Sequence, residues 1–140
     1  PQTTEEAQYS LPFPIAAALV FGRLGIEALS GDALVDEMVL QISECVEMIE
    51  DETFNTRFPA QRFARVVIET KDGAILDSGE VEANWDATTP PTNEELREKF
   101  RWLTHNQLSP KRTVELENMI WYCADLSDIS ELVRLLVEPA

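Results

Sequence analysis

An apolar run of eleven residues, Leu11 to Phe21 (LPFPIAAALVF), limits what this chain can fold into. A helix that is apolar on every side has no face suited to water and is therefore buried. The run is too short for a membrane span, which needs about 20 apolar residues. It also follows Glu5-Glu6, where a secretory signal would carry basic residues. Because Pro14 fits the first turn of a helix and Gly22 follows near its end, we predict a buried helix from about residue 14.

A second helix is predicted after Ser30-Gly31-Asp32, because the apolar residues that follow recur at a spacing of four. The alternation that comes next, from Val46 to Met48, favours a short strand ending at Glu50-Asp51-Glu52. Residues 53–62 are interpreted as a loop. On the second helix we expect the following side chains to face inward: Leu34, Met38 and Ile42, with Val35 and Val39 beside them.

Two β-branched segments, Phe63–Thr70 and Ala74–Val81, predict a hairpin. A two-residue turn would place Ile68 opposite an acidic residue. A three-residue loop with Gly73 in the left-handed region places Ile68 opposite Leu76 instead. The second register keeps the apolar side chains on one face, so we predict a hairpin with a bulge at Gly73.

Beyond a turn-rich boundary at residues 84–91 (NWDATTPP), the chain is predicted to be helical. Thr92 and Glu95 form a capping box at the start of one helix. Ser109-Pro110 begins another helix, which runs to about Ala124, and Asp128 with Glu131 caps the last one. The positions expected to face inward on these helices are Leu96, Phe100, Leu103, Leu116, Ile120, Cys123, Ile129, Leu132, Val133, Leu136 and Val137.

These elements predict the α+β class for the whole chain. Residues 1–91 are expected to hold a small antiparallel sheet, with its hairpin packed on helices, and residues 92–140 a three-helix segment. The length of 140 residues allows one domain with a real core, or one domain with a short appendage.

The net charge narrows the choice of partners. The chain has 26 acidic and 11 basic residues, a formal charge of −15. Nucleic acid and anionic membranes are excluded as partners, because binding to either requires clustered Lys and Arg. We interpret the acidity as a solubility feature. Cys45 and Cys123 lie among apolar residues without zinc spacing, so we expect buried free thiols and a cytoplasmic protein.

Enzyme motifs are mostly absent. The sequence has no Gly-rich phosphate loop and no GxSxG. Its one histidine, His105, is expected at a helix end, and a single histidine cannot build a histidine-based metal cluster. Acidic pairs such as Glu94-Glu95 are interpreted as solvated, because the sequence gives no sign that any one of these carboxylates is removed from water, as a catalytic carboxylate would be. From the residues alone we predict no catalytic residue, no metal and no cofactor.

Tyr9 and Ser10 precede the buried helix and allow two interpretations. In the first, Ser10 caps the helix or makes a turn, and Tyr9 packs against the core. In the second, these polar groups hold an anion together with the free N–H groups of the helix start. Spacing alone favours the first.

The segment Glu6–Gly22 (EAQYSLPFPIAAALVFG) resembles a pattern of the MmgE/PrpD family, EAxxSLPYxxAxxLxxG, that opens a buried helix. Cys45–Asp51 resembles a short strand of that family which ends in Asp, and Ala64–Gly73 resembles its hairpin. Pro90–Phe100 (PPTNEELREKF) is similar to its signature P-(S/T)-x-E-E-L-x-x-K-F. The four segments occur in the family's order and cover nearly the whole chain.

The resemblance implies a fold and a chemistry. Family members combine a large helical domain with a smaller α+β domain that resembles chorismate mutase, and the active site lies between the two. They include 2-methylcitrate dehydratase, cis-aconitate decarboxylase and iminodisuccinate epimerase, which remove or move a proton next to a carboxylate without a metal. By this resemblance residues 1–91 form most of the small domain. We expect the helical N-terminal domain, which supplies most catalytic residues, to lie outside this sequence.

The same resemblance implies that Gln8, Tyr9, Ser10 and Phe13 bind substrate. Phe13 stands where relatives often carry a tyrosine implicated in catalysis. Because phenylalanine has no hydroxyl, that proton-transfer role is lost here. The stretch Asn84-Trp85-Asp86 also departs from the glycine-containing stretch usual in the family.

Two functions remain open. In the first, the chain is the C-terminal portion of a lyase or isomerase of this family, inactive without the helical domain, whose substrate is a small polycarboxylate. In the second, it is a non-catalytic binding or assembly module of the same fold. We also expect a homo-oligomer, because the apolar faces of the last helices need a cover, either a second copy or the α+β part.

Overall fold

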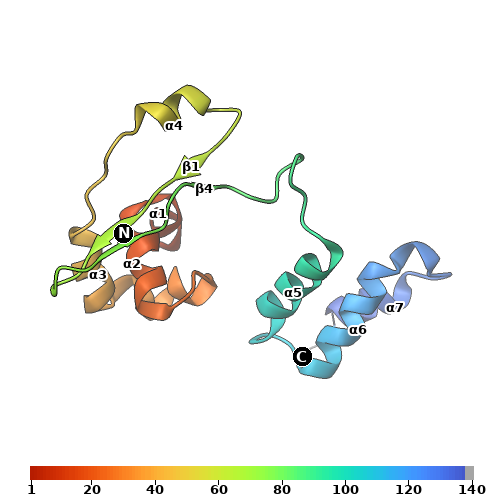
Figure 1. Ribbon diagram of the computed structural model, residues 1–140. Helices are drawn as coiled ribbons and strands as arrows, with labels where there is room; N and C mark the ends of the chain where they lie inside the picture. The colour runs from red at the N-terminus through yellow and green to blue at the C-terminus, as the bar shows by residue number, and fades with distance from the viewer. Residues whose placement is uncertain (138–140) are drawn as a thin grey trace. The chain divides into compact units, whose positions relative to one another are not determined.

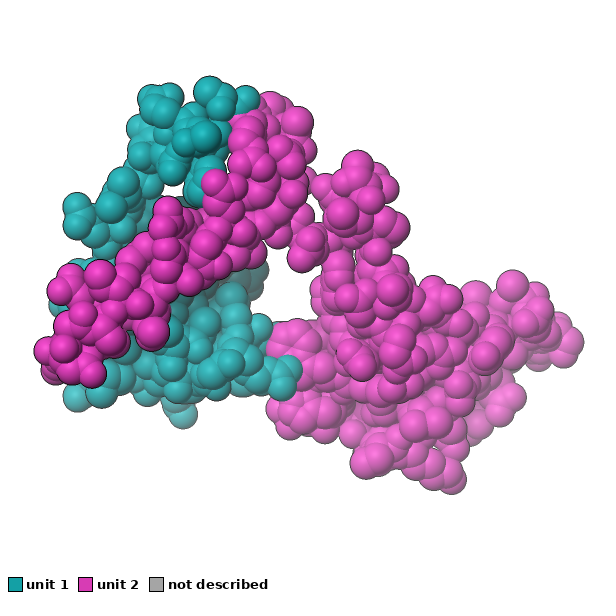
Figure 2. Space-filling view, viewed as in Figure 1, with its two compact units in different colours: residues 1–56 teal, residues 57–140 magenta. Residues whose placement is uncertain are grey.

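A computed structural model describes residues 1–137 of the protein. Figure 1 shows the helices and strands of the chain, and Figure 2 colours its two compact units, residues 1–56 and 57–140. The first unit is helical, and the second holds four short antiparallel strands and further helices. The α+β class is therefore confirmed. The units divide between Thr56 and Arg57, within one helix, and the domain boundary expected at residue 91 stays a prediction.

The first unit is built around the predicted helix of the apolar run, which is buried on one face only. The two helices that precede and form the apolar run are α1 (Thr4–Tyr9) and α2 (Pro12–Phe21). Phe13, Ala16 and Ala17 of α2 are completely buried, and the small alanines let neighbouring backbone approach closely. The helix starts at Pro12, two residues earlier than expected, and ends at Gly22, whose φ of 74° is the left-handed conformation that glycine adopts readily.

The predicted second helix is in fact two elements. A 3₁₀ turn, η2 (Gly31–Val35), is followed by α3 (Glu37–Glu44), and another turn, η1 (Ile26–Ala28), precedes both. The break lies at Asp36, whose Oδ1 accepts hydrogen bonds from the N–H groups of Met38 (2.9 Å) and Val39 (3.0 Å). Because α3 begins anew at this cap, its buried face differs from the one predicted for a single continuous helix. Val39 lies in the core, whereas Val35 and Met38, which were predicted to face inward, are exposed.

The first core consists of Phe13 and Val39 with four alanines. Leu34 and Ile42, both expected to face inward, are partly buried and pack against it. The core is completed by Ala7, Ala16, Ala17 and Ala28, with Val20, Leu29 and Leu40 at its margin.

The segment after α3 differs from prediction. Residues 46–51 form neither helix nor strand, so the short strand expected at Val46–Met48 is wrong. The loop expected over residues 53–62 begins with a helix, α4 (Glu52–Arg57). Asp51 explains this helix, because its Oδ1 accepts hydrogen bonds from the N–H groups of Thr53 (2.8 Å) and Phe54 (3.3 Å).

The second unit contains the hairpin in the predicted register. Ile68 lies opposite Leu76, and Gly73 has a φ of 86°. The hairpin ladder is split into two strand pairs because its second arm carries one extra residue near Ser78. At this point the N–H of Val66 donates to the Oγ of Ser78 (2.9 Å) and not to a backbone carbonyl. The pairs are β1 (Phe63–Ala64) with β4 (Val81–Glu82), and β2 (Val67–Glu69) with β3 (Ile75–Asp77).

Gly73→Ala should weaken the hairpin by about 1–2 kcal/mol, because a residue with a Cβ is strained in the left-handed region. Apart from Gly73 and its two chain neighbours, no residue has an atom within 4 Å of the position that this Cβ would take, so the loss would come from the backbone conformation alone. Amide exchange at Val67–Glu69 measures the effect. Gly73→Asn is the control, since asparagine enters this region more readily and should lose less. Equal exchange in wild type and G73A would contradict the prediction.

Three helices follow, α5 (Asn93–Thr104), α6 (Pro110–Trp121) and α7 (Ser130–Val137), with a 3₁₀ turn, η3 (Cys123–Asp125). The capping box of Thr92 and Glu95 is confirmed, with both reciprocal hydrogen bonds formed. Ser109 caps α6 through the N–H of Arg112, and Pro110 is its first residue, as predicted. The second core consists of Leu116, Leu132 and Leu135, with Phe100, Leu108, Met119 and Leu126 packed against it.

The inward faces of these helices were predicted less well than their starts. α6 ends at Trp121, before the expected Ala124, and on α7 the residue Leu135 is buried although it was not expected to be. A pair of buried leucines three apart, Leu132 and Leu135, rotates α7 away from the predicted face. The residues expected inward that are exposed are Leu96, Leu103, Ile120, Ile129, Val133, Leu136, Val137 and Cys123.

Both cysteines are free and exposed, so the expectation of buried thiols is wrong. Cys45 ends α3 as its C-cap and Cys123 opens the turn after α6. Each therefore lies at the margin of a helix, where apolar neighbours in sequence do not imply burial.

In the described part of the chain no single helix is long and apolar enough to cross a membrane. α2 and the turns at residues 26–35 pass a test of length and composition only when taken together, and they are bent by 116°. Buried core helices pass the same test. α2 places Phe13, Ala16 and Ala17 in the core, but Leu19 and Phe21 are exposed, so the prediction of a helix buried on every side is wrong.

Candidate functional site

The corner between α1 and α2 carries the four residues expected to bind substrate. Thr3 is the N-cap of α1, and its Oγ1 accepts the N–H of Glu6 (3.1 Å). Ser10 is the C-cap, and its N–H donates to the carbonyl of Glu6 (3.0 Å). The Ser10 hydroxyl then accepts the N–H of Phe13 (3.2 Å) in the first turn of α2. Ser10 therefore closes one helix and opens the next, as the capping interpretation predicts.

The structure separates the four side chains. Gln8 is exposed, and Tyr9 is 85% exposed, so the expectation that Tyr9 packs against the core is wrong. Phe13 is 0% exposed and belongs to the first core. The corner thus presents Gln8 and Tyr9 to solvent on a turn that Ser10 and Phe13 hold in place.

The charge around this corner is strongly negative. Residues 1–56 contain eleven acidic residues and one basic residue, Arg23. Glu5 and Glu6 lie in the first turn of α1, next to the exposed side chains. An anionic ligand here would meet repulsion, because a surface of one charge sign lowers the local concentration of ligands of that sign. A polycarboxylate therefore needs cations supplied from outside this unit.

His105 ends α5, in agreement with prediction. Its Nδ1 lies 2.6 Å from the carbonyl oxygen of Trp102, the carbonyl of its own helix end. Among residues 1–137 there is no group of three or more His, Cys, Asp and Glu side chains that could hold a metal ion.

The most tightly knit charged cluster in the described residues joins α5 to α6. Glu117, 5% exposed, accepts hydrogen bonds from Arg97 (2.5 Å) and from two nitrogens of Arg101 (both 2.7 Å). The Arg97 guanidinium also lies over the ring of Trp121, 4.4 Å from its centroid. These contacts, first those from Arg101, lower the pKa of Glu117. This arrangement indicates a structural role, because each charged side chain of the cluster already binds another member of it.

Sequence reasoning missed this cluster. Arg97 and Arg101 are four apart and therefore share a helix face, which was a readable signal. Their partner lies 16 and 20 residues further on, and no local pattern identifies it.

Comparison with known proteins decides the family. The family model for the MmgE/PrpD C-terminal domain matches residues 1–122. The chain belongs to the MmgE/PrpD family. The expected resemblance is thereby confirmed, and the α1–α2 corner lies inside the matched range.

One curated protein that the chain matches is the cis-aconitate decarboxylase-like protein oryM from Aspergillus oryzae. It is 28% identical to this MmgE/PrpD chain over 138 residues, which cover 97% of the chain and 28% of the relative. The chain therefore spans between a quarter and a third of the length of the curated relative it matches.

Proposed function

We propose that this chain is the C-terminal portion of an MmgE/PrpD-type enzyme that acts on a small polycarboxylate. The reaction is a dehydration, decarboxylation or epimerisation in which a proton next to a carboxylate is moved or removed. The observation that carries the proposal is the family match over residues 1–122. The name of the Aspergillus oryzae relative, a cis-aconitate decarboxylase-like protein, supports the same substrate class.

In this proposal the α1–α2 corner is one wall of the substrate site. Gln8 and Tyr9 contact substrate, since their side chains are exposed at the corner and can donate hydrogen bonds to a carboxylate. Ser10 contributes less directly, because its hydroxyl is used by the N–H of Phe13. Phe13 is a positioning residue, because its buried ring anchors the start of α2 and cannot reach a ligand.

The base and the cations of the reaction come from outside the first unit. A general base must lie within hydrogen-bond reach of the proton that it abstracts. The corner offers no histidine or lysine, and Glu5 and Glu6 repel the substrate. We infer that a helical domain supplies both, that the enzyme works in the cytoplasm, and that it assembles as a homo-oligomer.

The test compares residues 1–140 alone with the same chain fused to the part of the Aspergillus oryzae relative that lies outside the matched segment. Turnover of cis-aconitate and 2-methylcitrate is followed by proton NMR in D₂O. We expect no exchange or conversion with the chain alone, and conversion with the fusion that drops when Gln8 or Tyr9 is replaced by alanine. Clear turnover by the chain alone would disprove the dependence on another domain. An active fusion unaffected by Q8A and Y9A would disprove the role of the corner.

A second function is favoured by one observation, namely that the residue at the position of the family's tyrosine is a fully buried phenylalanine. A chain that lacks this hydroxyl can still bind a carboxylate or a partner subunit without catalysis. Size-exclusion chromatography combined with a binding screen of small acids separates the two functions. Stoichiometric binding together with an inactive fusion would favour the binding or assembly module.

A further inference from the structure

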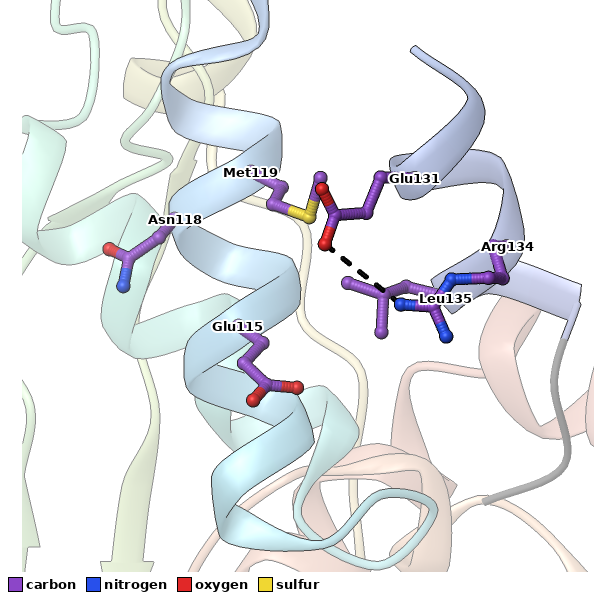
Figure 3. A pocket seen from close by; sticks show the side chains of 6 residues that line it. All are labelled: Glu115, Asn118, Met119, Glu131, Arg134 and Leu135. Carbon is purple, nitrogen blue, oxygen red and sulfur yellow. Dashed lines mark ion pairs between the residues drawn. The ribbon is translucent and has the colours of Figure 1, made fainter. Parts of the chain in front are cut away.

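The three C-terminal helices are packed together, and residues 83–92 connect them to the hairpin. The second core joins side chains of α6 and α7, and Phe100 of α5 packs against it. Figure 3 shows Met119 of α6 and Leu135 of α7, both of this core, beside the groove between the two helices. Any motion of the helices relative to the hairpin therefore has to pass through the connecting residues.

Trp85 gives this connection an unusual backbone conformation. Its φ is 69°, and among residues 1–137 it is the one residue other than glycine with a positive φ. A bulky residue is strained in the left-handed region, and it stays there only where its surroundings hold it. Hydrogen bonds close the backbone around it. The N–H of Trp85 donates to the carbonyl of Thr89 (3.1 Å), and Asp86 Oδ1 accepts the N–H groups of Thr88 (2.8 Å) and Thr89 (3.0 Å).

The side chain of Trp85 is attached to α5. Its ring faces the ammonium group of Lys99, whose Nζ lies 5.0 Å from the ring centroid. The pKa of Glu95 is lowered first by the backbone and side-chain hydrogen bonds of Thr92, and then by a hydrogen bond from the Trp85 side chain. Glu95 and Lys99 are four residues apart and share one face of α5. The ring therefore lies on the first two turns of the helix.

The residue before this turn region is bound to the hairpin instead. The N–H of Ala83 donates to the carbonyl of Arg62 (3.0 Å), which continues the register of β1 with β4. Asn84 alone lies between Ala83, which is held by the hairpin, and Trp85, which is held by α5. Asn84 is exposed, and no hydrogen bond or ion pair of the described residues involves it.

We propose that the Trp85 ring, seated on Glu95 and Lys99, is a latch that makes residues 85–92 a rigid extension of α5. The joint between the hairpin and the three helices is then Asn84 alone. The prolines at 90 and 91, where composition favours a boundary, lie inside the rigid part. Because one residue has only two soft backbone dihedrals, the helices move relative to the hairpin about one point and not along a flexible linker.

The test is a measurement of backbone ¹⁵N relaxation on residues 1–140. We expect the amides of residues 86–89 to have the order parameters of α5, about 0.85, and Asn84 to have a clearly lower value. Trp85→Gly separates the ring from the backbone, because glycine adopts the left-handed conformation without strain. In W85G the order parameters of residues 86–89 should fall below about 0.6, while those of α5 stay unchanged.

A matched pair of lysine variants tests the contact between ring and cation. Lys99→Gln removes the cation that faces the ring and should lower the order parameters of residues 86–89, though less than W85G does. Lys111→Gln, on α6, is the control and should leave them unchanged. Circular dichroism verifies that each variant keeps its helices. The proposal is overturned if residues 86–89 of the wild type are as mobile as Asn84. It is also overturned if W85G leaves them rigid, or if K99Q and K111Q have the same effect.

Discussion

Phe13→Ala should destabilise the first unit by about 3–5 kcal/mol, the usual loss for a phenylalanine removed from a core. Phe13 and Val39 are the two largest side chains that are completely buried, and the rest of that core is alanine. Small neighbours have no side-chain length with which to fill the cavity, so collapse can recover little of the loss. Urea unfolding followed by far-UV circular dichroism, together with amide exchange in α2, measures the effect.

Phe21→Ala provides the control for this prediction. Phe21 is the last residue of the same helix and is 42% exposed, so its removal should cost less than half as much. If the two variants lose similar stability, Phe13 is not the anchor of the α1–α2 corner. The proposed arrangement of Gln8 and Tyr9 would then lose its support.

Glu117→Gln should destabilise the α5–α6 pair by about 3 kcal/mol. The substitution removes the one negative charge that lies between Arg97 and Arg101, leaving two guanidinium groups without their shared partner. Trp102 and Trp121 lie in the two helices, so urea unfolding followed by tryptophan fluorescence reports the change. Glu98→Gln on exposed α5 surface is the control and should change stability by no more than about 0.5 kcal/mol.

The effect of Glu117→Gln should depend on pH in a defined direction. The hydrogen bonds from Arg101 and Arg97 lower the pKa of Glu117 below its ordinary value of 4.5. The folded state therefore holds the charged form more strongly than the unfolded state does. The stabilisation is complete above the ordinary pKa and is lost as the pH falls through the lower folded value. The difference between wild type and E117Q should be constant near neutral pH and shrink in acid. A difference that grows in acid would contradict this assignment.

Helix starts and the hairpin register were predictable because they depend on residues close in sequence. The capping box at Thr92 needs only Glu95, and the pairing of Ile68 with Leu76 follows from the left-handed turn at Gly73. Asp36 and Asp51 are local caps of the same kind. Reading them as caps would have placed the break before α3 and the start of α4.

Features that need a distant partner were not predictable. The apolar alternation at Val46–Met48 suits a strand, but a strand forms only with a neighbour, and the described residues show none there. Which face of α7 is buried depends on how it meets Leu116, so Leu135 rather than Leu136 faces the core. At the candidate site the sequence identified Ser10 as a cap, but the exposure of Tyr9 follows from the turn between two helices.

The two exposed thiols are natural labelling sites for a distance measurement between the two units. Cys45 belongs to the first unit and Cys123 to the second, and both are free and accessible. A pair of spin labels or fluorophores attached at these two positions needs no engineered cysteine. The distance between such labels would report how the two units are arranged in solution, and how that arrangement responds when a polycarboxylate or a helical partner domain is added.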